Sequence, residues 1–379
     1  MANIIGTSND DILFGTAFDD WLDGLNGNDV LYAGDGNDGL SGGAGDDFLY
    51  GEAGDDNLIG GPGDDLLDGG SNGPFVDTAD YNNDPSGVVV NLVTGTATDG
   101  WGGTDTLVNI ESVTGSSFND YLIGDAGNNW FRPGTGIDYV DAGGGYDVVF
   151  YENLTAGGVV IDLYAGWAQE LDAGGNVLST DTILNFEAAH GSYFDDIITL
   201  ANGNNYAFGR AGDDEIYGLS GNDNLIGGSG GDTLDGGANS DWASYSDDGY
   251  DGGGAAFQGA VINLALGTAI DGWGDMDTLI SIENIAGSQF GDQITGDNNA
   301  NSLIGRGGND TIIGGGGFDW LQGGSGNDSL DGGGGYDIAN YKNDEYDDIS
   351  ITNSSIVAHL GAVSTVSDRW GNTDTLISI

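Results

Sequence analysis

Gly24-Leu25-Asn26-Gly27-Asn28-Asp29-Val30-Leu31-Tyr32 is one copy of a nine-residue pattern, G-G-x-G-x-D-x-U-x, in which U is a large apolar residue. The pattern continues without a slip on both sides of this stretch, and a leucine follows each aspartate by two positions. The aspartates of this first block are Asp11, Asp20, Asp29, Asp38, Asp47, Asp56 and Asp65. A fixed phase of this kind predicts a solenoid built from one repeated structural unit.

The composition limits what such a chain can do. Its 379 residues include 75 glycines and carry 62 acidic against 5 basic side chains, a net charge of −57. Low hydrophobicity with high charge would predict disorder, but disorder requires no fixed period, so we expect a fold that depends on counter-ions. The same charge makes nucleic acid and anionic membranes poor partners.

Disulfide-bonded, thiol-metal and membrane-spanning proteins are disfavoured by what the sequence lacks. There is no cysteine, hence neither a disulfide framework nor a thiol metal site. No apolar run of about 18 residues predicts a membrane span, and the first six residues do not form a Sec-type signal peptide.

Three further blocks keep the nine-residue step. They place acids or amides at Asp120, Asn129, Asp138 and Asp147; at Asp196, Asn205, Asp214, Asp223, Asp232 and Asp241; and at Asp292, Asn301, Asp310, Asp319, Asp328 and Asp337. Asparagine stands second in each of these blocks, which predicts weaker metal binding there, or none.

A longer repeat separates the blocks. Its copies contain Asp-Gly-Trp-Gly, Asp-Thr-Leu or Ile-Glu motifs and start at Tyr81, Tyr151, Tyr245 and Tyr341. β-Branched runs between Gly and Asp turns predict strands, and no useful helical period is present. We expect one continuous solenoid over 1–379, with nonapeptide blocks at 1–74, 119–145, 195–240 and 291–335 and wider coils at 75–118, 146–194, 241–290 and 336–379.

Each nonapeptide combines a turn with a short strand. Glycine in the turn reaches left-handed conformations that other residues resist, and the apolar residue of the strand points inward. Two units then form one 18-residue coil, and coils stack about 4.8 Å apart as hydrogen-bonded strands do. The predicted fold is an all-β parallel β-roll, or β-solenoid, of stacked 18-residue coils interrupted by wider coils.

Stacking places the aspartates in rows along two edges. Neighbouring carboxylates then repel by roughly 1 kcal/mol even at the dielectric of water. One buried Leu or Ile per unit gives about 1.5–3 kcal/mol, which does not offset backbone ordering of about 1–2 kcal/mol per residue. A cation between turns replaces repulsion by ligation, and carboxylate with carbonyl oxygens suits Ca²⁺ better than Mg²⁺. We predict that calcium binding and folding are one event.

The predicted ligands are the aspartates in register and glycine carbonyls of the turns. The aspartates are Asp11, Asp20, Asp29, Asp38, Asp47, Asp56, Asp65, Asp120, Asp138, Asp147, Asp196, Asp214, Asp223, Asp232, Asp241, Asp292, Asp310, Asp319, Asp328 and Asp337. The carbonyls belong to Gly27, Gly36, Gly45, Gly54, Gly63, Gly221, Gly230 and Gly326. Arg132, Pro133 and Arg210 depart from the pattern inside turns, where we expect reduced calcium occupancy.

Over most of the chain, these motifs resemble RTX, or haemolysin-type calcium-binding, repeat proteins. The resemblance implies several bound Ca²⁺ ions, secretion by a type I system and calcium-triggered folding outside the cell. The C-terminal secretion segment usual in that family is not recognisable in this sequence.

Few other residues predict chemistry. Trp101, Trp273 and Trp370 could stack on a cell-surface glycan, but we expect them to pack over the wider coils. His190 and His359 have no evident metal-ligand partner. Acidic pairs recur too often for a unique acid–base pair, and no Walker loop, nucleophile elbow or His-Glu-x-x-His motif is present. We therefore expect no enzymatic activity.

The two ends of the sequence match one internal junction. Residues 374–379 repeat residues 277–282, and the sequence from Ala2 onward continues in the register of Glu283 onward. Ala2-Asn3-Ile4 of another copy would thus complete the coil that stops at Ile379, which predicts head-to-tail stacking into a filament or a ring. The alternative is a piece of a longer RTX protein that stops at a repeat boundary.

Two function classes follow. The first is a secreted, calcium-binding structural protein that forms a filament or surface layer. The second is a repeat segment of a larger secreted adhesin, or the carrier module of a secreted enzyme, and a further domain encoded beyond Ile379 would favour it.

Overall fold

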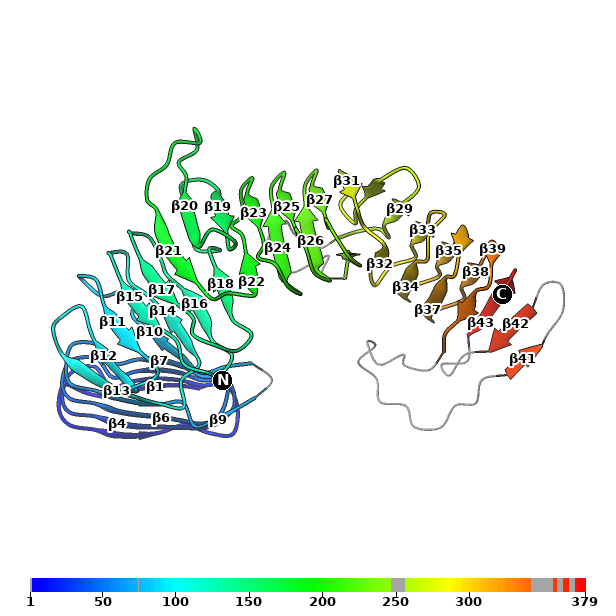
Figure 1. Ribbon diagram of the computed structural model, residues 1–379. Coiled ribbons are helices and arrows are strands. Elements are labelled where there is room, and N and C mark those ends of the chain that lie inside the picture. Colours follow the sequence, from blue (N-terminus) through cyan, green and yellow to red (C-terminus); the bar gives the residue numbers. More distant parts are fainter. Residues whose placement is uncertain (1, 74, 247–255, 342–356, 360–363, 368–371) are drawn as a thin grey trace. The chain divides into compact units, whose positions relative to one another are not determined.

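The computed structural model describes residues 2–73, 75–246, 256–341, 357–359, 364–367 and 372–379 (Figure 1). All regular elements in these residues are β-strands. The described residues contain no helix long and apolar enough to cross a membrane. Packing divides the chain into two units, Met1–His190 and Gly191–Ile379, which are described separately. This division falls close to the end of the second predicted wider coil at residue 194.

In the first unit, the chain alternates between two sheets, which we call the first and second faces. The first face contains β1 (Asn3–Ile5), β3 (Trp21–Asp23), β5 (Gly39–Ser41), β7 (Asn57–Ile59), β10 (Thr78–Asp80), β14 (Ser112–Thr114), β16 (Trp130–Arg132), β18 (Val148–Phe150) and β22 (Ala188–His190). The second face contains β2 (Ile12–Phe14), β4 (Val30–Asp35), β6 (Phe48–Gly54), β8 (Leu66–Asp68), β9 (Ser71–Asn72), β11 (Val89–Asn91), β12 (Thr96–Thr98), β13 (Thr104–Val108), β15 (Tyr121–Ile123), β17 (Tyr139–Asp141), β19 (Val159–Asp162), β20 (Trp167–Glu170) and β21 (Asp181–Leu184).

The second unit repeats the two-faced arrangement. Its first face contains β24 (Tyr206–Ala211), β26 (Asn224–Ser229), β28 (Trp242–Ser244), β32 (Asn284–Ala286), β34 (Ser302–Gly307), β37 (Trp320–Ser325) and β40 (Ile338–Ala339). Its second face contains β23 (Ile197–Thr199), β25 (Glu215–Tyr217), β27 (Thr233–Asp235), β29 (Val261–Asn263), β30 (Thr268–Ile270), β31 (Met276–Ile280), β33 (Gln293–Thr295), β35 (Thr311–Ile313), β38 (Ser329–Asp331), β41 (Val357–His359), β42 (Ser364–Ser367) and β43 (Thr373–Ile377). A separate pair joins β36 (Gly316–Gly317) to β39 (Gly334–Gly335).

The strand register confirms the 18-residue coil. β1 pairs in parallel with β3, with Asn3 opposite Trp21, and β2 pairs in parallel with β4, with Ile12 opposite Val30. The middle residue of each three-residue strand points into the core, because alternate residues of a strand face opposite sides. The nonapeptide leucines from Leu22 to Leu67 are completely buried. The fold is therefore a parallel β-roll whose narrow core lies between the two faces.

The wider coils add strands unequally to the two faces. In the first copy, β13, β12 and β11 form an antiparallel meander between β8 and β15, and β13 and β11 pair in parallel with those two flanking strands. The order β31, β30, β29 between β27 and β33 repeats this arrangement in the second unit. The sequence predicts coils of greater width, and the structure shows that the extra width is a three-stranded meander.

The tyrosine that marks each of the first three wider coils connects that coil to the core. The hydroxyl of Tyr81 donates a hydrogen bond to Asp105 Oδ2 at 3.1 Å. Tyr151 and Tyr245 donate in the same way to Asp181 and Asp277, at 2.9 and 3.0 Å. By contrast, Trp101 is 45% exposed and so does not pack fully over its coil, and Trp370 lies outside the described residues.

Candidate calcium centres

Two columns of aspartates run through the first nonapeptide block. In one column the backbone N–H of Asp29 donates to Asp47 Oδ1 at 2.7 Å, and that of Asp47 donates to Asp65 Oδ1 at 2.8 Å. The other column links Asp20, Asp38 and Asp56 in the same way, at 2.6 and 2.8 Å. The aspartates therefore line two edges of the solenoid, as the nine-residue step predicts.

One carboxylate oxygen remains unsatisfied at most of these positions. All twenty predicted aspartates except Asp11 are buried, each with at most 7% of its surface exposed. The atom Oδ2 is buried without a hydrogen-bond partner at Asp29, Asp38, Asp47, Asp56, Asp65, Asp138, Asp147, Asp214, Asp223, Asp232, Asp241, Asp319 and Asp337. A buried acceptor without a partner costs about 1–3 kcal/mol, and more when it is charged. A cation at these oxygens removes that cost.

Five aspartates at or near the start of a block are different. Thr7 donates its backbone N–H to Asp11 Oδ2 at 2.6 Å, and Ser116 donates its N–H to Asp120 Oδ2 at 2.7 Å. Asp20, Asp196 and Asp292 receive the same bond from Thr16, Ser192 and Ser288. The nine-residue step does not separate these five aspartates from the others, although a Ser or Thr four residues earlier marks each of them in the sequence.

The turn glycines make room for the carboxylates and for the next turn. A Cβ on Gly42 would collide with Asp47 Oδ2, so this position requires glycine. Gly45 has a φ of 140°, and a Cβ on it would collide with the carbonyl oxygen of Gly27, one coil earlier. The same contact joins Gly54 to Gly36, Gly63 to Gly45, Gly221 to Gly203, Gly230 to Gly212 and Gly326 to Gly308. Of the eight predicted carbonyls, those of Gly27, Gly36 and Gly45 thus point from one coil toward the next.

Burial makes these carboxyl groups hard to ionise. It raises the pKa of Asp47 to about 6 and, with help from neighbouring carboxylates, that of Asp56 to about 7. The pKa of Asp65 rises to about 8, mainly through burial and then through the charge of Asp105. A bound cation lowers the cost of the ionised form, because opposite charges within about 4–6 Å favour it.

The donor set fits calcium. No group of three or more His, Asp or Glu side chains within the described ranges is arranged to hold a metal ion, so backbone carbonyls must supply much of any coordination sphere. Ca²⁺ accepts six to eight oxygen ligands of mixed type in flexible geometry, whereas Mg²⁺ demands a near-ideal octahedron. The orphaned Oδ2 atoms and the aligned carbonyls therefore match Ca²⁺.

The wider coils continue the aspartate columns, at positions that the nine-residue step does not predict. Asp56 donates its N–H to Asp77 Oδ1 at 2.8 Å, and Asp65 donates to Asp105 Oδ1 at 3.1 Å. Asp181, Asp277 and Asp374 accept equivalent bonds from Asp138, Asp232 and Asp328, and Glu187 and Glu283 accept from Asp147 and Asp241. Asp77 stands twelve residues after Asp65. The nine-residue step therefore could not find it, although its place four residues before the marker Tyr81 could.

Two of the predicted asparagine variants, Asn129 and Asn301, have both ends of the side-chain amide bonded within the solenoid. Asn301 donates from Nδ2 to the carbonyl oxygen of Glu283 at 2.8 Å and accepts at Oδ1 from the N–H of Asp297 at 2.9 Å. Asn129 forms the equivalent pair of bonds, and Asn205 donates its backbone N–H to Asp223 Oδ1. An amide with both ends bonded offers little to a cation, so weak calcium binding at Asn129 and Asn301 stays a prediction with a physical reason.

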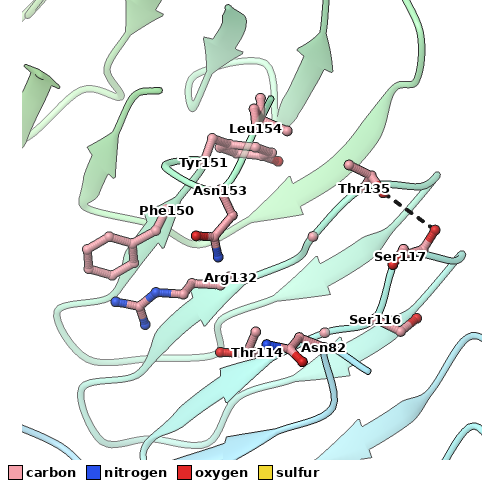
Figure 2. Close-up of a pocket in the computed structure, with 12 residues that line it drawn as sticks. Asn82, Thr114, Ser116, Ser117, Arg132, Thr135, Phe150, Tyr151, Asn153 and Leu154 are labelled. Atoms are coloured by element: carbon pink, nitrogen blue, oxygen red, sulfur yellow. Dashed lines mark hydrogen bonds between the residues drawn. The ribbon is translucent and has the colours of Figure 1, made fainter. Parts of the chain in front are cut away.

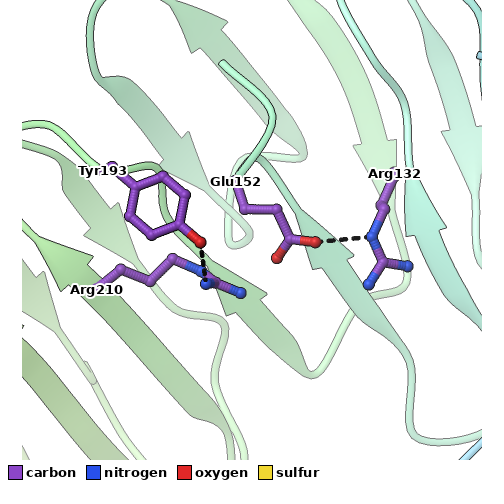
Figure 3. A network of polar contacts seen from close by, with 4 residues as sticks. All are labelled: Arg132, Glu152, Tyr193 and Arg210. Atoms are coloured by element: carbon purple, nitrogen blue, oxygen red, sulfur yellow. Dashed lines mark hydrogen bonds and ion pairs between the residues drawn. The ribbon is translucent and has the colours of Figure 1, made fainter. Parts of the chain in front are cut away.

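The arginines inside the solenoid contact neighbouring side chains. Arg132 forms an ion pair with Glu152, with 2.8 Å between Nε and Oε1, and its guanidinium lies 4.4 Å from the ring centroid of Phe150. In the second unit, Arg210 donates to the hydroxyl of Tyr193 at 3.1 Å. Figure 3 shows both contacts. These arginines have structural partners.

A recess of about 250 Å³ lies beside Arg132 on the first unit (Figure 2). Hydroxyl and amide side chains such as Thr135 and Asn153 line it together with Phe150 and Tyr151, and no carboxylate is among the described residues of its wall. It therefore resembles neither the calcium centres nor an acid–base site.

Comparison with known proteins agrees with this geometry. The RTX calcium-binding nonapeptide repeat (4 copies) matches residues 5–40, 41–73, 114–149, 190–225, 217–248, 281–312 and 304–339, which is more than half of the chain. No curated protein matches the chain. Among solved structures it is similar to the crystal structure of extracellular lipase LipA from Serratia marcescens, with 14% identity and a TM-score of 0.16. That similarity covers 100% of this chain and 38% of the lipase chain. The chain belongs to the family of proteins built from RTX calcium-binding nonapeptide repeats.

Proposed function

We propose that the chain is an extracellular structural protein whose folding is driven by Ca²⁺ and which assembles head to tail into a filament or surface layer. RTX repeats imply calcium binding and secretion. The finer proposal includes export by a type I system and location at the cell surface. It also excludes catalysis, which agrees with carboxylates that recur in one environment along a column.

The observation that carries this proposal is the row of buried, unpaired Oδ2 atoms. Asp29, Asp38, Asp47 and Asp56 each hold such an oxygen within one nonapeptide block. Without cations, these groups must stay protonated or repel one another, and the narrow core offers little compensation. Calcium binding to the folded state alone therefore shifts the equilibrium strongly toward folding.

A calcium titration tests this proposal. Far-UV circular dichroism and hydrodynamic radius are measured from chelator to millimolar Ca²⁺, with Mg²⁺ as the matched control. We expect an expanded chain without calcium, and a cooperative gain of β-structure with compaction on adding Ca²⁺ but not Mg²⁺. A chain that is already compact and β-rich in chelator would contradict calcium-driven folding.

A further inference from the structure

The two ends of the solenoid present unpaired strand edges. In the first unit, β1 pairs only with β3 and β2 only with β4 among the described strands. In the second unit, β40 pairs only with β37, and β41 only with β42, within the same described residues. We propose that these edges bind each other between two copies of the chain, in the backbone register of an internal junction. This inference deepens the proposed function and depends on it, because calcium must first fold the coils.

The internal junctions supply the template. Where β28 meets β32, Asn284 donates its N–H to the carbonyl oxygen of Asp241 at 2.9 Å, and Tyr245 donates to that of Ala286 at 2.8 Å. The first unit repeats this pair of bonds twice. They join Ser112 to Asp77 and Tyr81 to Thr114, and then Ala188 to Asp147 and Tyr151 to His190.

The residues at the two ends of the chain align with the residues of this internal junction. Asp337 and Tyr341 stand where Asp241 and Tyr245 stand in the internal junction, and Asn3 and Ile5 stand where Asn284 and Ala286 do. The bond expected between copies is therefore from the N–H of Asn3 to the carbonyl oxygen of Asp337. Ile338 then opposes Asn3, as Trp242 opposes Asn284 within the chain.

The second face offers a matching edge. β41 is the equivalent of β29, because both open the meander of their wider coil with the same antiparallel register. β29 pairs in parallel with β33, with Val261 opposite Gln293, and β2 is the equivalent of β33. β41 of one copy is therefore expected to pair with β2 of the next, with Val357 opposite Ile12.

The backbone N–H and C=O groups of β1 that do not bond to β3 point toward the open edge of the sheet. Gly6 donates its N–H to Asp23, and Ala2 accepts from the N–H of Trp21, so these alternate residues bond toward β3. The N–H and C=O groups of Asn3, between them, are directed to the open edge. An unpaired strand edge is a ready template for another chain, and here the available donor is the one that the internal junctions use.

Exposure of apolar side chains supports coverage by another coil. Ile379 is 47% exposed, whereas its internal equivalents Ile110, Phe186 and Ile282 are only 5–8% exposed. At the other end, Ile5, Ile12 and Phe14 are 58–66% exposed. Apolar groups on an open strand edge favour association. Because the contact joins two different surfaces, it generates a filament, or a ring if the rotation closes.

A backbone-specific substitution tests the interface. Asn3→Pro removes the N–H that points to the open edge, and proline is tolerated on edge strands; Asn3→Ala keeps the N–H and is the matched control. With saturating Ca²⁺, light scattering and electron microscopy should show wild type and Asn3→Ala growing into assemblies with concentration. Asn3→Pro should stay a monomer with the same circular dichroism spectrum.

Cross-linking tests the register independently of proline. The chain has no cysteine of its own, so chains carrying Asn3→Cys and Ile338→Cys are mixed with Ca²⁺ and oxidised. We expect a disulfide-linked heterodimer from this mixture, and much less when Ala339→Cys replaces Ile338→Cys. A folded wild type that remains a monodisperse monomer, or equal linkage at both positions, would overturn the interface. Failure to fold with calcium would instead contradict the proposed function.

Discussion

At the scale of the residue, adjacent carboxylates in one turn have different tasks. Asp47 is buried with an unpaired Oδ2, whereas its neighbour Asp46 is exposed. Asp47→Asn removes one charged ligand, worth about 1.5–3 kcal/mol for a bond to a charged group. The calcium midpoint of folding should therefore rise roughly tenfold or more. Asp46→Asn is the matched control and should leave the midpoint within a factor of about two. Equal effects of the two substitutions in a calcium titration would contradict the assignment.

The nine-residue step predicts Asp47 and its equivalents from the sequence alone. It cannot distinguish Asp47 from Asp120, because the difference is a hydrogen bond to Asp120 Oδ2 from the backbone N–H of Ser116. Asp77 was missed for a different reason, since the insertion before it breaks the step while the stacking of coils restores its position. Spacing therefore predicts the members of a column inside a nonapeptide block, and local hydrogen bonds decide which carboxylate oxygens remain for a cation.

At the scale of the element, each of the first three wider coils depends on one buried tyrosine hydroxyl. Tyr151 is 2% exposed and donates to Asp181 Oδ2. Tyr151→Phe leaves that buried oxygen without its partner and should destabilise the first unit by about 1–3 kcal/mol. The thermal midpoint in saturating Ca²⁺ should fall by roughly 2–4 °C for each kcal/mol. Tyr121→Phe, at an outer-face residue that is 47% exposed, is the matched control and should change it little. Equal midpoints for both variants would exclude the fastening role.

The strands of the nonapeptide blocks could be predicted because period, turn glycines and inward leucines agree. The meander formed by β11, β12 and β13 could not, because the longer repeat has no nine-residue phase and its strands pair antiparallel. The turn into the next block contains Asn109, which has a φ of 50°, and the equivalent Ser281 and Ser378 have φ values of 50° and 52°. Asparagine tolerates the left-handed conformation at Asn109, but a serine at the equivalent Ser281 and Ser378 gives no such signal, as a glycine would.

At the scale of the whole molecule, the buried carboxyl groups make calcium-free stability depend on pH. In the folded state, the pKa values of Asp47, Asp56 and Asp65 rise from 3.8 to about 6, 7 and 8. At pH values between the ordinary pKa and the raised pKa of each group, the folded state holds a proton that the unfolded state has released. The stability of the folded state therefore falls as pH increases. In chelator, the chain should be more compact and richer in β-structure at pH 5 than at pH 8.

Saturating Ca²⁺ should remove or reverse the greater compactness at pH 5 than at pH 8, because the ion binds the ionised carboxylates and competes with their protons. Circular dichroism and hydrodynamic radius at both pH values, with and without calcium, provide the comparison. Asp47→Asn should weaken the pH dependence in chelator, since it removes a titrating group, whereas Asp46→Asn should preserve it. A calcium-free chain equally expanded at pH 5 and pH 8 would show that protons cannot replace calcium. The ion would then be needed to bridge coils, because neutralising single carboxylates would not suffice.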